Sequence, residues 1–180
     1  MNPKELHFDQ EGRDKLLEGI TLMSKTVKST LGPSGHTVMM ESPNHTKGMT
    51  ITKDGVTVAK NFDLEDPVSN LAVSLMKEAA SLTALSAGDG TTTAIVLTEA
   101  IIKNGMNLLK DNKINVNVLI KDIQSLSEDI ISKLDESSKN VDGETLKDVA
   151  TISANNDKDL GDMIADAYNE IGKDGKLTVE

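Results

Sequence analysis

A glycine–aspartate–glycine segment followed by three threonines holds the residue types of this 180-residue sequence that best suit phosphate chemistry. The segment reads GDGTTT over residues 88–93 and leads into an apolar run. If a helix begins near Thr91, its first-turn N–H groups are unpaired and attract anions, helped by the positive end of the helix dipole. Gly88 and Gly90 allow close backbone approach, and Asp89 can hold a divalent cation against phosphate oxygens. The threonines add hydroxyl donors, so the segment predicts a phosphate site with its own metal ligand.

A purely structural interpretation of this segment stays open, because glycines before threonines also suit a turn and a helix cap. Two other motifs are equally ambiguous: TLGPSG at 30–35 is typical of a helix stop, and TKDG at 52–55 is by itself a turn signal. The sequence has neither a G-x-x-x-x-G-K-[ST] motif nor a G-x-G-x-x-G motif after a strand. Taken singly, each motif is therefore weak evidence for nucleotide binding.

Composition argues against several classes of partner and chemistry. The formal net charge is −10 and no run of Lys or Arg interrupts it, which disfavours nucleic acid and anionic membrane surfaces as partners. Without cysteine there is no disulfide, thiolate zinc site or cysteine nucleophile. The N-terminus has no apolar signal core and no segment approaches a membrane span, so we expect a cytoplasmic protein.

Hydrophobic spacing predicts a mainly α fold, with a core of aliphatic residues and Met because the sequence has one Tyr, two Phe and no Trp. The helices are expected over about 11–30, 68–82, 94–102 and 119–134. The third should be central and buried, since it is apolar on nearly every side. A hairpin is expected from strands at 36–41 and 49–53. The polar stretch after Asp135 predicts a domain boundary near residue 136, followed by a capped helix that ends at Gly172.

Four motifs occur in a specific order and spacing: TLGPSG (30–35), TITKDGVTVAKNFDLEDP (50–67), AGDGTTTAIVLTEAII (87–102) and TISANND (151–157). In this order and spacing they resemble one family, the GroEL-type group I chaperonins. The resemblance runs from about Leu6 to Glu180, and GDGTTTA is highly specific to these proteins. It implies that 1–136 form the first segment of an equatorial ATP-binding domain and 137–180 the first segment of an α+β intermediate domain. It also implies an apical domain and returning segments, which we expect outside these 180 residues.

The resemblance also implies a set of site residues for Mg-ATP. Nucleotide would be contacted by Thr30, Leu31, Gly32, Pro33, Lys53, Gly90, Thr91, Thr92, Thr93, Ile152 and Ser153, the last two from a hinge segment. Lys53 would lie beside the phosphates and Asp54 would orient the attacking water. Asp89 would be the Mg²⁺ ligand, and K⁺ is a second candidate cation. Ser34 and His36 depart from the family, which usually has a basic pair around this turn glycine.

The function that the resemblance implies is ATP-driven assistance of protein folding inside a homo-oligomeric ring. Ring neighbours would meet through the hairpin 36–53 and an N-terminal strand at 6–8. Unfolded client proteins, and a co-chaperonin as a further candidate partner, would bind through the absent apical domain. ATP hydrolysis is expected only in the full-length ring, because in the family a second aspartate from the returning segment shares the task of Asp54.

Two alternatives remain at this stage. One is a free-standing assembly module that keeps the nucleotide loops and hydrolyses nothing. The other, a small-molecule phosphotransferase, is disfavoured because nothing suggests a second substrate pocket. For the 180 residues alone we expect apolar faces of the helices at 68–82 and 119–134 to be uncovered, which favours association.

Overall fold

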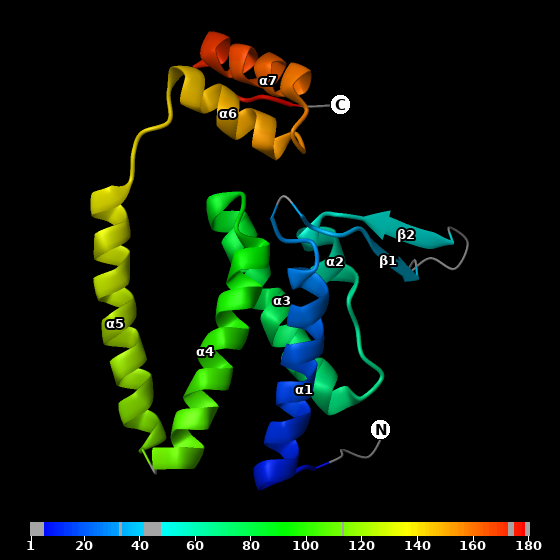
Figure 1. The fold of residues 1–180 in the computed structure, drawn as a ribbon, viewed down its shortest axis with the longest axis vertical. Coiled ribbons are helices and arrows are strands. Elements are labelled where there is room, and N and C mark those ends of the chain that lie inside the picture. Colours follow the sequence, from blue (N-terminus) through cyan, green and yellow to red (C-terminus); the bar gives the residue numbers. More distant parts are fainter. Residues whose placement is uncertain (1–5, 33, 42–47, 113, 173–174, 179–180) are drawn as a thin grey trace. The chain divides into compact units, whose positions relative to one another are not determined.

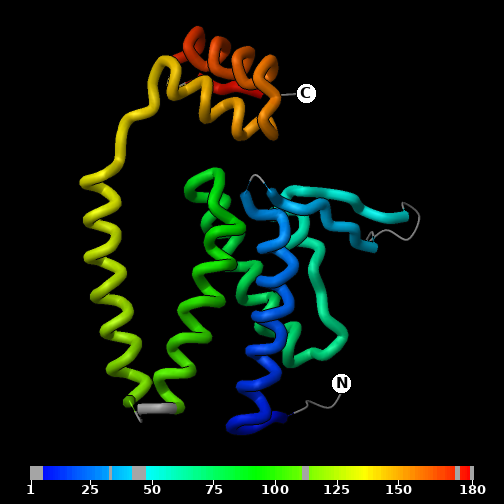
Figure 2. The backbone as a smooth tube through the Cα atoms, viewed as in Figure 1, coloured from blue at the N-terminus to red at the C-terminus, as the bar shows by residue number. Residues whose placement is uncertain are grey.

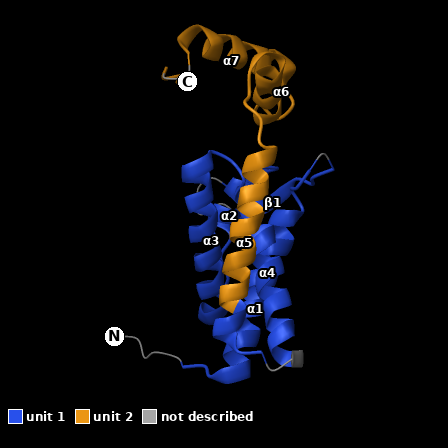
Figure 3. Cartoon of the chain, turned by 90° about the vertical axis from the view of Figure 1, so that its left-hand side faces the viewer, with its two compact units in different colours: residues 1–119 blue, residues 120–180 orange. Residues whose placement is uncertain are grey.

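A computed structural model describes residues 6–32, 34–41, 48–112, 114–172 and 175–178. Its elements are α1 (Asp9–Lys28), β1 (Val38–Glu41), β2 (Met49–Thr52), α2 (Gly55–Asn61), α3 (Pro67–Ala87), α4 (Thr91–Asn112), α5 (Val116–Ser137), α6 (Gly143–Ser153) and α7 (Lys158–Ile171) (Figure 1). The chain divides into two compact units, residues 1–119 and 120–180 (Figure 3). This division falls within α5, and the predicted domain boundary near 136 stays a prediction. The mainly α fold class is confirmed.

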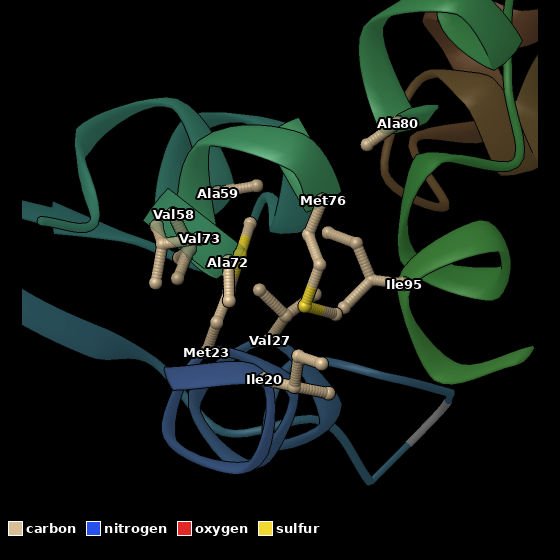
Figure 4. Close-up of a cluster of buried hydrophobic side chains, with 10 residues drawn as sticks. All are labelled: Ile20, Met23, Val27, Val58, Ala59, Ala72, Val73, Met76, Ala80 and Ile95. Carbon is tan, nitrogen blue, oxygen red and sulfur yellow. The ribbon is translucent and has the colours of Figure 1, made fainter. Parts of the chain in front are cut away.

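The core of the first unit lies between α1, α2, α3 and α4, of which α1, α3 and α4 lie side by side (Figure 2). Figure 4 shows its cluster of buried apolar residues, which are Ile20, Met23, Val27, Val58, Ala59, Ala72, Val73, Met76, Ala80 and Ile95. The α1 members recur at spacings of three and four, which places them on one face of the helix. The helix predicted over about 11–30 is therefore confirmed as α1.

The helix predicted at 94–102 is central, since α4 contacts α1, α2 and α3, but the prediction that it is buried is wrong for much of its surface. It buries one stripe, Thr91, Ile95 and Glu99 at spacings of four, while Leu97 and Ile101 remain at least half exposed. Among the described helices, α1, α2 and α3 contact α4, and they leave the side chains of Leu97 and Ile101 exposed. Apolar composition therefore predicted more burial than these three helices provide.

Leucines on α3 and α5 leave large apolar surfaces exposed, as the sequence predicted. On α3 the exposed side chains are Leu71, Leu75, Leu82 and Leu85. On α5 no described residue is buried, and its exposed apolar residues include Leu126, Ile130 and Leu134. A surface of this kind normally marks an interaction face or promotes aggregation.

The hairpin pairs β1 with β2 in antiparallel register from Val38 opposite Thr52 to Glu41 opposite Met49, as predicted. Its tip, residues 42–47, lies outside the described residues. This pair is the one sheet within the described chain. Residues 6–8 form no strand here, although Phe8 has extended backbone. Their expected partner belongs to another subunit, so pairing of this segment stays a prediction.

Aspartate caps define the start of two helices in the first unit. Asp66 accepts hydrogen bonds from the N–H groups of Val68 and Ser69 and so caps α3, and Asp54 caps α2 in the same way. Asp66 also pairs with Lys15 at 2.8 Å. The hydrogen bond from Lys15, followed by that from the Ser69 N–H, lowers the pKa of Asp66 well below its ordinary value. The two caps thus bond the N–H groups at the same two following positions, while Asp66 also has a lysine partner.

The second unit contains the packed pair α6 and α7 (Figure 1). The turn between them uses Asn155 and Asn156 at φ 59° and 63°, a left-handed conformation that Asn tolerates better than most residues. Gly161 brings the helices close, since a Cβ there would lie 2.3 Å from the Thr151 Oγ1. Asp157 caps α7 through the Leu160 N–H. The helix predicted to end at Gly172 is confirmed.

Gly19→Ala is expected to destabilise the first unit by about 2–3 kcal/mol, because a Cβ at this position would lie 2.1 Å from the Ser69 carbonyl oxygen. Relief requires α1 and α3 to separate, which costs more than the roughly 1 kcal/mol of helix propensity that alanine gains. Gly12→Ala in the same helix is the control, since its Cβ would meet the His7 oxygen at an ordinary 3.5 Å. Urea unfolding of both variants measures the difference, and equal midpoints would contradict the close approach.

Candidate nucleotide-binding site

Gly55 is the point at which three sequence motifs, distant along the chain, meet. A Cβ built on Gly55 would lie 2.1 Å from the Thr92 Oγ1 and 3.1 Å from the Thr30 Oγ1. Thr30 follows α1, Gly55 is the first residue of α2 and Thr92 is in the first turn of α4. The absence of a side chain at residue 55 therefore lets two hydroxyl groups converge on one backbone position. Each of the three motifs is ambiguous by itself, but together they lie at one place and form a single candidate site.

Asp54 immediately precedes this meeting point and holds both carboxylate oxygens toward the start of α2. Its Oδ1 accepts from the Val56 N–H at 3.1 Å, and its Oδ2 accepts from the Thr57 N–H at 2.9 Å and the Thr57 hydroxyl at 2.6 Å. Partial burial alone raises the pKa of Asp54, but the bonds from Thr57 and Val56 and the charge of Lys60 outweigh it and lower the pKa. Since a carboxylate offers about four lone-pair positions, one on Oδ1 remains for another donor.

The Gly-Asp-Gly turn joins α3 to α4 in a conformation that requires its glycines. Gly88 ends α3 at φ 75° and Gly90 has φ 92°. Asp89 is exposed, and its Oδ1 accepts from the Gly90 N–H at 2.6 Å. No described residue donates to its Oδ2. The first donor of the α4 hydrogen-bond ladder is Ala94, so the N–H groups of the three threonines have no partner within the helix.

A metal ion at this turn would depend on Asp89. Among the described residues no group of three or more His, Cys, Asp or Glu side chains could hold a metal. Mg²⁺ is commonly bound through one or two carboxylates together with substrate phosphates and water. The single free oxygen of Asp89, beside unpaired N–H groups that attract phosphate, fits this kind of site.

The three threonines point in different directions because successive residues of a helix are about 100° apart. Thr91 is only 4% exposed and its hydroxyl has no hydrogen-bond partner. Thr92 faces Gly55, and Thr93 is exposed to solvent. The Thr91 side chain borders a hollow of about 120 Å³, which is also lined by Val56, Ala59, Lys60, Lys77, Ala80, Ser81 and Ala84.

The remaining predicted residues fall into two groups. Beside the site, the Thr30 hydroxyl donates to the Val27 carbonyl at 2.8 Å, Gly32 has φ 76°, and Leu31 and Lys53 are exposed. Pro33 lies outside the described residues. Ile152 and Ser153 are the last residues of α6, in the second unit. Their approach to nucleotide stays a prediction.

A buried ionic cluster behind the site was missed by the sequence reasoning. The Glu99 carboxylate on α4 accepts from the Ser24 hydroxyl at 2.6 Å, from the Lys103 ammonium at 2.6 Å and from the Lys28 ammonium. Burial alone raises the pKa of Glu99, but these three hydrogen bonds outweigh it and lower the pKa to about 2. The available signal was a single carboxylate inside an apolar run, eight residues after Thr91 and so on the same helix face.

Comparison with known proteins identifies the family to which this chain belongs. Residues 23–180 match the TCP-1/cpn60 chaperonin family, and the chain belongs to this family. The structure is similar to two crystal forms of the chaperonin gp146 from the bacteriophage EL 2 (Pseudomonas aeruginosa), both in the presence of ATP-BeFx. Sequence identity is 29% in both comparisons, with TM-scores of 0.77 and 0.78 over 93% and 94% of this chain.

These matches confirm the resemblance to chaperonins and the equatorial-type helical fold with its hairpin. This chain spans 29–30% of the length of gp146. In the part of the chain that the structure describes, no helix combines the length and apolar character needed to cross a membrane.

Proposed function

We propose that this chain contributes the nucleotide site of an ATP-driven chaperonin, which binds Mg-ATP and hydrolyses it to move its domains during protein folding. The observation that carries the proposal is the convergence of Thr30 and Thr92 on Gly55, with Asp54 and Asp89 on the adjoining turns. Membership of the chaperonin family supports the same activity. Each motif taken alone fits a turn or a helix cap equally well. The convergence of the three motifs on one position favours the interpretation that they bind a shared ligand.

Each part of the site has a distinct task in the proposed mechanism. The unpaired N–H groups at the start of α4 bind phosphate oxygens, aided by the helix dipole. Asp89 would hold Mg²⁺, which when bound together with the phosphates would supply positive charge next to the γ-phosphate. Asp54 uses its remaining Oδ1 lone pair to orient the attacking water. Because its pKa is lowered, Asp54 stays ionised and can accept a hydrogen bond but is a weak base, so positioning is its main contribution.

The oligomeric part of the proposal rests on the hairpin. Met39, Met49 and Ile51 are exposed on it, and a two-stranded sheet leaves both outer edges open. A neighbouring subunit could add its segment 6–8 to this sheet by β-augmentation. The added strand would pair with backbone N–H and C=O groups at one open edge. Clients and a co-chaperonin would bind elsewhere in the full-length protein. A cytoplasmic location and a role for K⁺ belong to the same proposal.

Phosphate release by the full-length protein tests the function. We expect steady-state release of phosphate from ATP with Mg²⁺ and its loss when EDTA removes the metal. A protein that binds nucleotide without releasing phosphate would instead be a non-hydrolytic assembly module. Transfer of phosphate to an added acceptor, with no release to water, would indicate a phosphotransferase.

A further inference from the structure

The Glu99 cluster joins two helices that both lead to the proposed nucleotide site. The Glu99 side chain is 7% exposed and receives hydrogen bonds from Ser24 and Lys28 on α1. Its third donor, Lys103, lies one turn further along α4 itself. The hydrogen bonds from Ser24 and Lys28 therefore link α1 to α4, whereas the hydrogen bond from Lys103 to the same carboxylate lies within α4.

Each bridged helix has a threonine hydroxyl near Gly55: Thr30 shortly after the end of α1, and Thr92 in the first turn of α4. Lys28 is the last residue of α1 and lies two residues before Thr30. Glu99 shares the buried stripe of α4 with Ile95 and Thr91, and Thr92 follows in the first turn. A shift of α1 along α4 would therefore move Thr30 relative to Thr92, on the two sides of Gly55.

A buried carboxylate is a costly way to hold two helices together by packing alone. Removing a carboxylate from water is unfavourable, and apolar residues of similar volume are often as stabilising as a buried ion pair. An ionic cluster with directed hydrogen bonds differs from apolar packing because it favours one relative position of its partners. Ser24, Lys28 and Lys103 satisfy the carboxylate in the observed arrangement of α1 and α4.

We propose that Glu99 is a positioning residue that acts through Lys28 and Ser24 to hold the Thr30 loop against the start of α4, and thereby sets nucleotide affinity. The inference rests on the proposed function, since it assumes that nucleotide binds between these segments. It concerns affinity rather than the hydrolytic step, because Asp54 is carried by the β2–α2 turn and not by either bridged helix.

The test compares Lys28→Met with Lys103→Met in the full-length protein. The two lysines are matched, since their side chains are 43% and 41% exposed and both bond Glu99. Lys28→Met is expected to raise the Kd for Mg-ADP and the KM for Mg-ATP about fivefold, with kcat changed by less than about twofold. Lys103→Met should leave both constants within about twofold, although it removes an ion pair from the same carboxylate. Lys28→Arg, which keeps the charge, should restore affinity.

Glu99→Gln gives an independent check, because it removes the charge while keeping the side-chain shape. It should weaken Mg-ADP binding as Lys28→Met does, and the double variant should be no weaker than either single one. Equal effects of Lys28→Met and Lys103→Met would show general destabilisation and overturn the positioning role. So would unchanged affinity in Lys28→Met while the parent binds Mg-ADP. A parent protein that fails to bind Mg-ADP would overturn the proposed function, and this inference with it.

Discussion

Asp54→Asn is expected to lower kcat for ATP hydrolysis in the full-length protein about 100-fold or more, while Mg-ATP affinity changes less than about twofold. Asparagine caps helices about as well as aspartate, so α2 should keep its start. The substitution removes the negative charge and weakens the free Oδ1 acceptor that would orient the attacking water. Steady-state phosphate release and equilibrium binding of Mg-ATP measure the two quantities separately.

The lowered pKa of Asp54 adds a pH criterion to this prediction. Its hydrogen bonds from Thr57 and Val56 outweigh the opposing effect of burial and lower the pKa below 3.8, so the group is ionised from about pH 5 upward. Protonation of Asp54, and with it loss of its acceptor role, would occur only as the pH falls below that range. A decline in kcat between about pH 8 and pH 5 therefore has to come from another group.

Asp66→Asn is the matched control for this substitution. Asp66 caps α3 through the N–H groups at the second and third following residues, as Asp54 caps α2. It lies outside the convergence at Gly55 and is paired with Lys15. Asp66→Asn should cost stability and leave kcat within about twofold. A comparable fall in kcat for both variants would mean that Asp54 acts only as a helix cap.

Local features of the fold were predictable because their causes lie within a few residues. The stripe of Ile20, Met23 and Val27 follows from helical spacing, and the end of α7 follows from Gly172. The hairpin strands were placed within two residues of their observed bounds. In each case the signal and the structure it specifies lie next to each other in the chain.

The burial of α4 was mispredicted because composition does not report which neighbours a helix has. Ala94 to Ile102 is apolar on nearly every side, yet only the stripe with Ile95 is covered. The same run contains Glu99, whose partners Ser24 and Lys28 are more than seventy residues away along the chain. Long-range ionic contacts of this kind depend on how α1 and α4 pack, which spacing alone does not fix.

In the candidate site, too, the local features could be predicted from the sequence and the long-range contacts could not. The motifs themselves indicated which segments to examine, and the turn glycines have the conformations that such turns require. The convergence of Thr30 and Thr92 on Gly55 needed the packed structure, as did the differing directions of Thr91 and Thr93. The phosphate role of these residues stays a prediction that substitution can test.

Asp89→Asn is expected to weaken Mg-ATP binding by about 100-fold or more, since loss even of groups that only support a metal ligand commonly costs 10–100-fold. The asparagine oxygen can still accept from the Gly90 N–H, which keeps the turn that Asp89 stabilises at 2.6 Å. What is lost is the negative charge of the carboxylate in the turn immediately before the start of α4. Far-UV circular dichroism should be unchanged, and isothermal titration with Mg-ATP measures the loss. Asp14→Ala, at an exposed position of α1, is the control for removal of one negative charge.

Removal of the metal distinguishes a ligand from a residue that supports the turn. If Asp89 holds Mg²⁺, then EDTA should weaken ATP binding strongly in the parent and hardly at all in Asp89→Asn, because the variant has already lost the metal-dependent part. Affinity of the two proteins should then converge in EDTA, since the coupling between metal and nucleotide is a shared free energy. Equal sensitivity to EDTA in parent and variant would assign the metal to other ligands, and Asp89 would then act only on the conformation of the turn between α3 and α4.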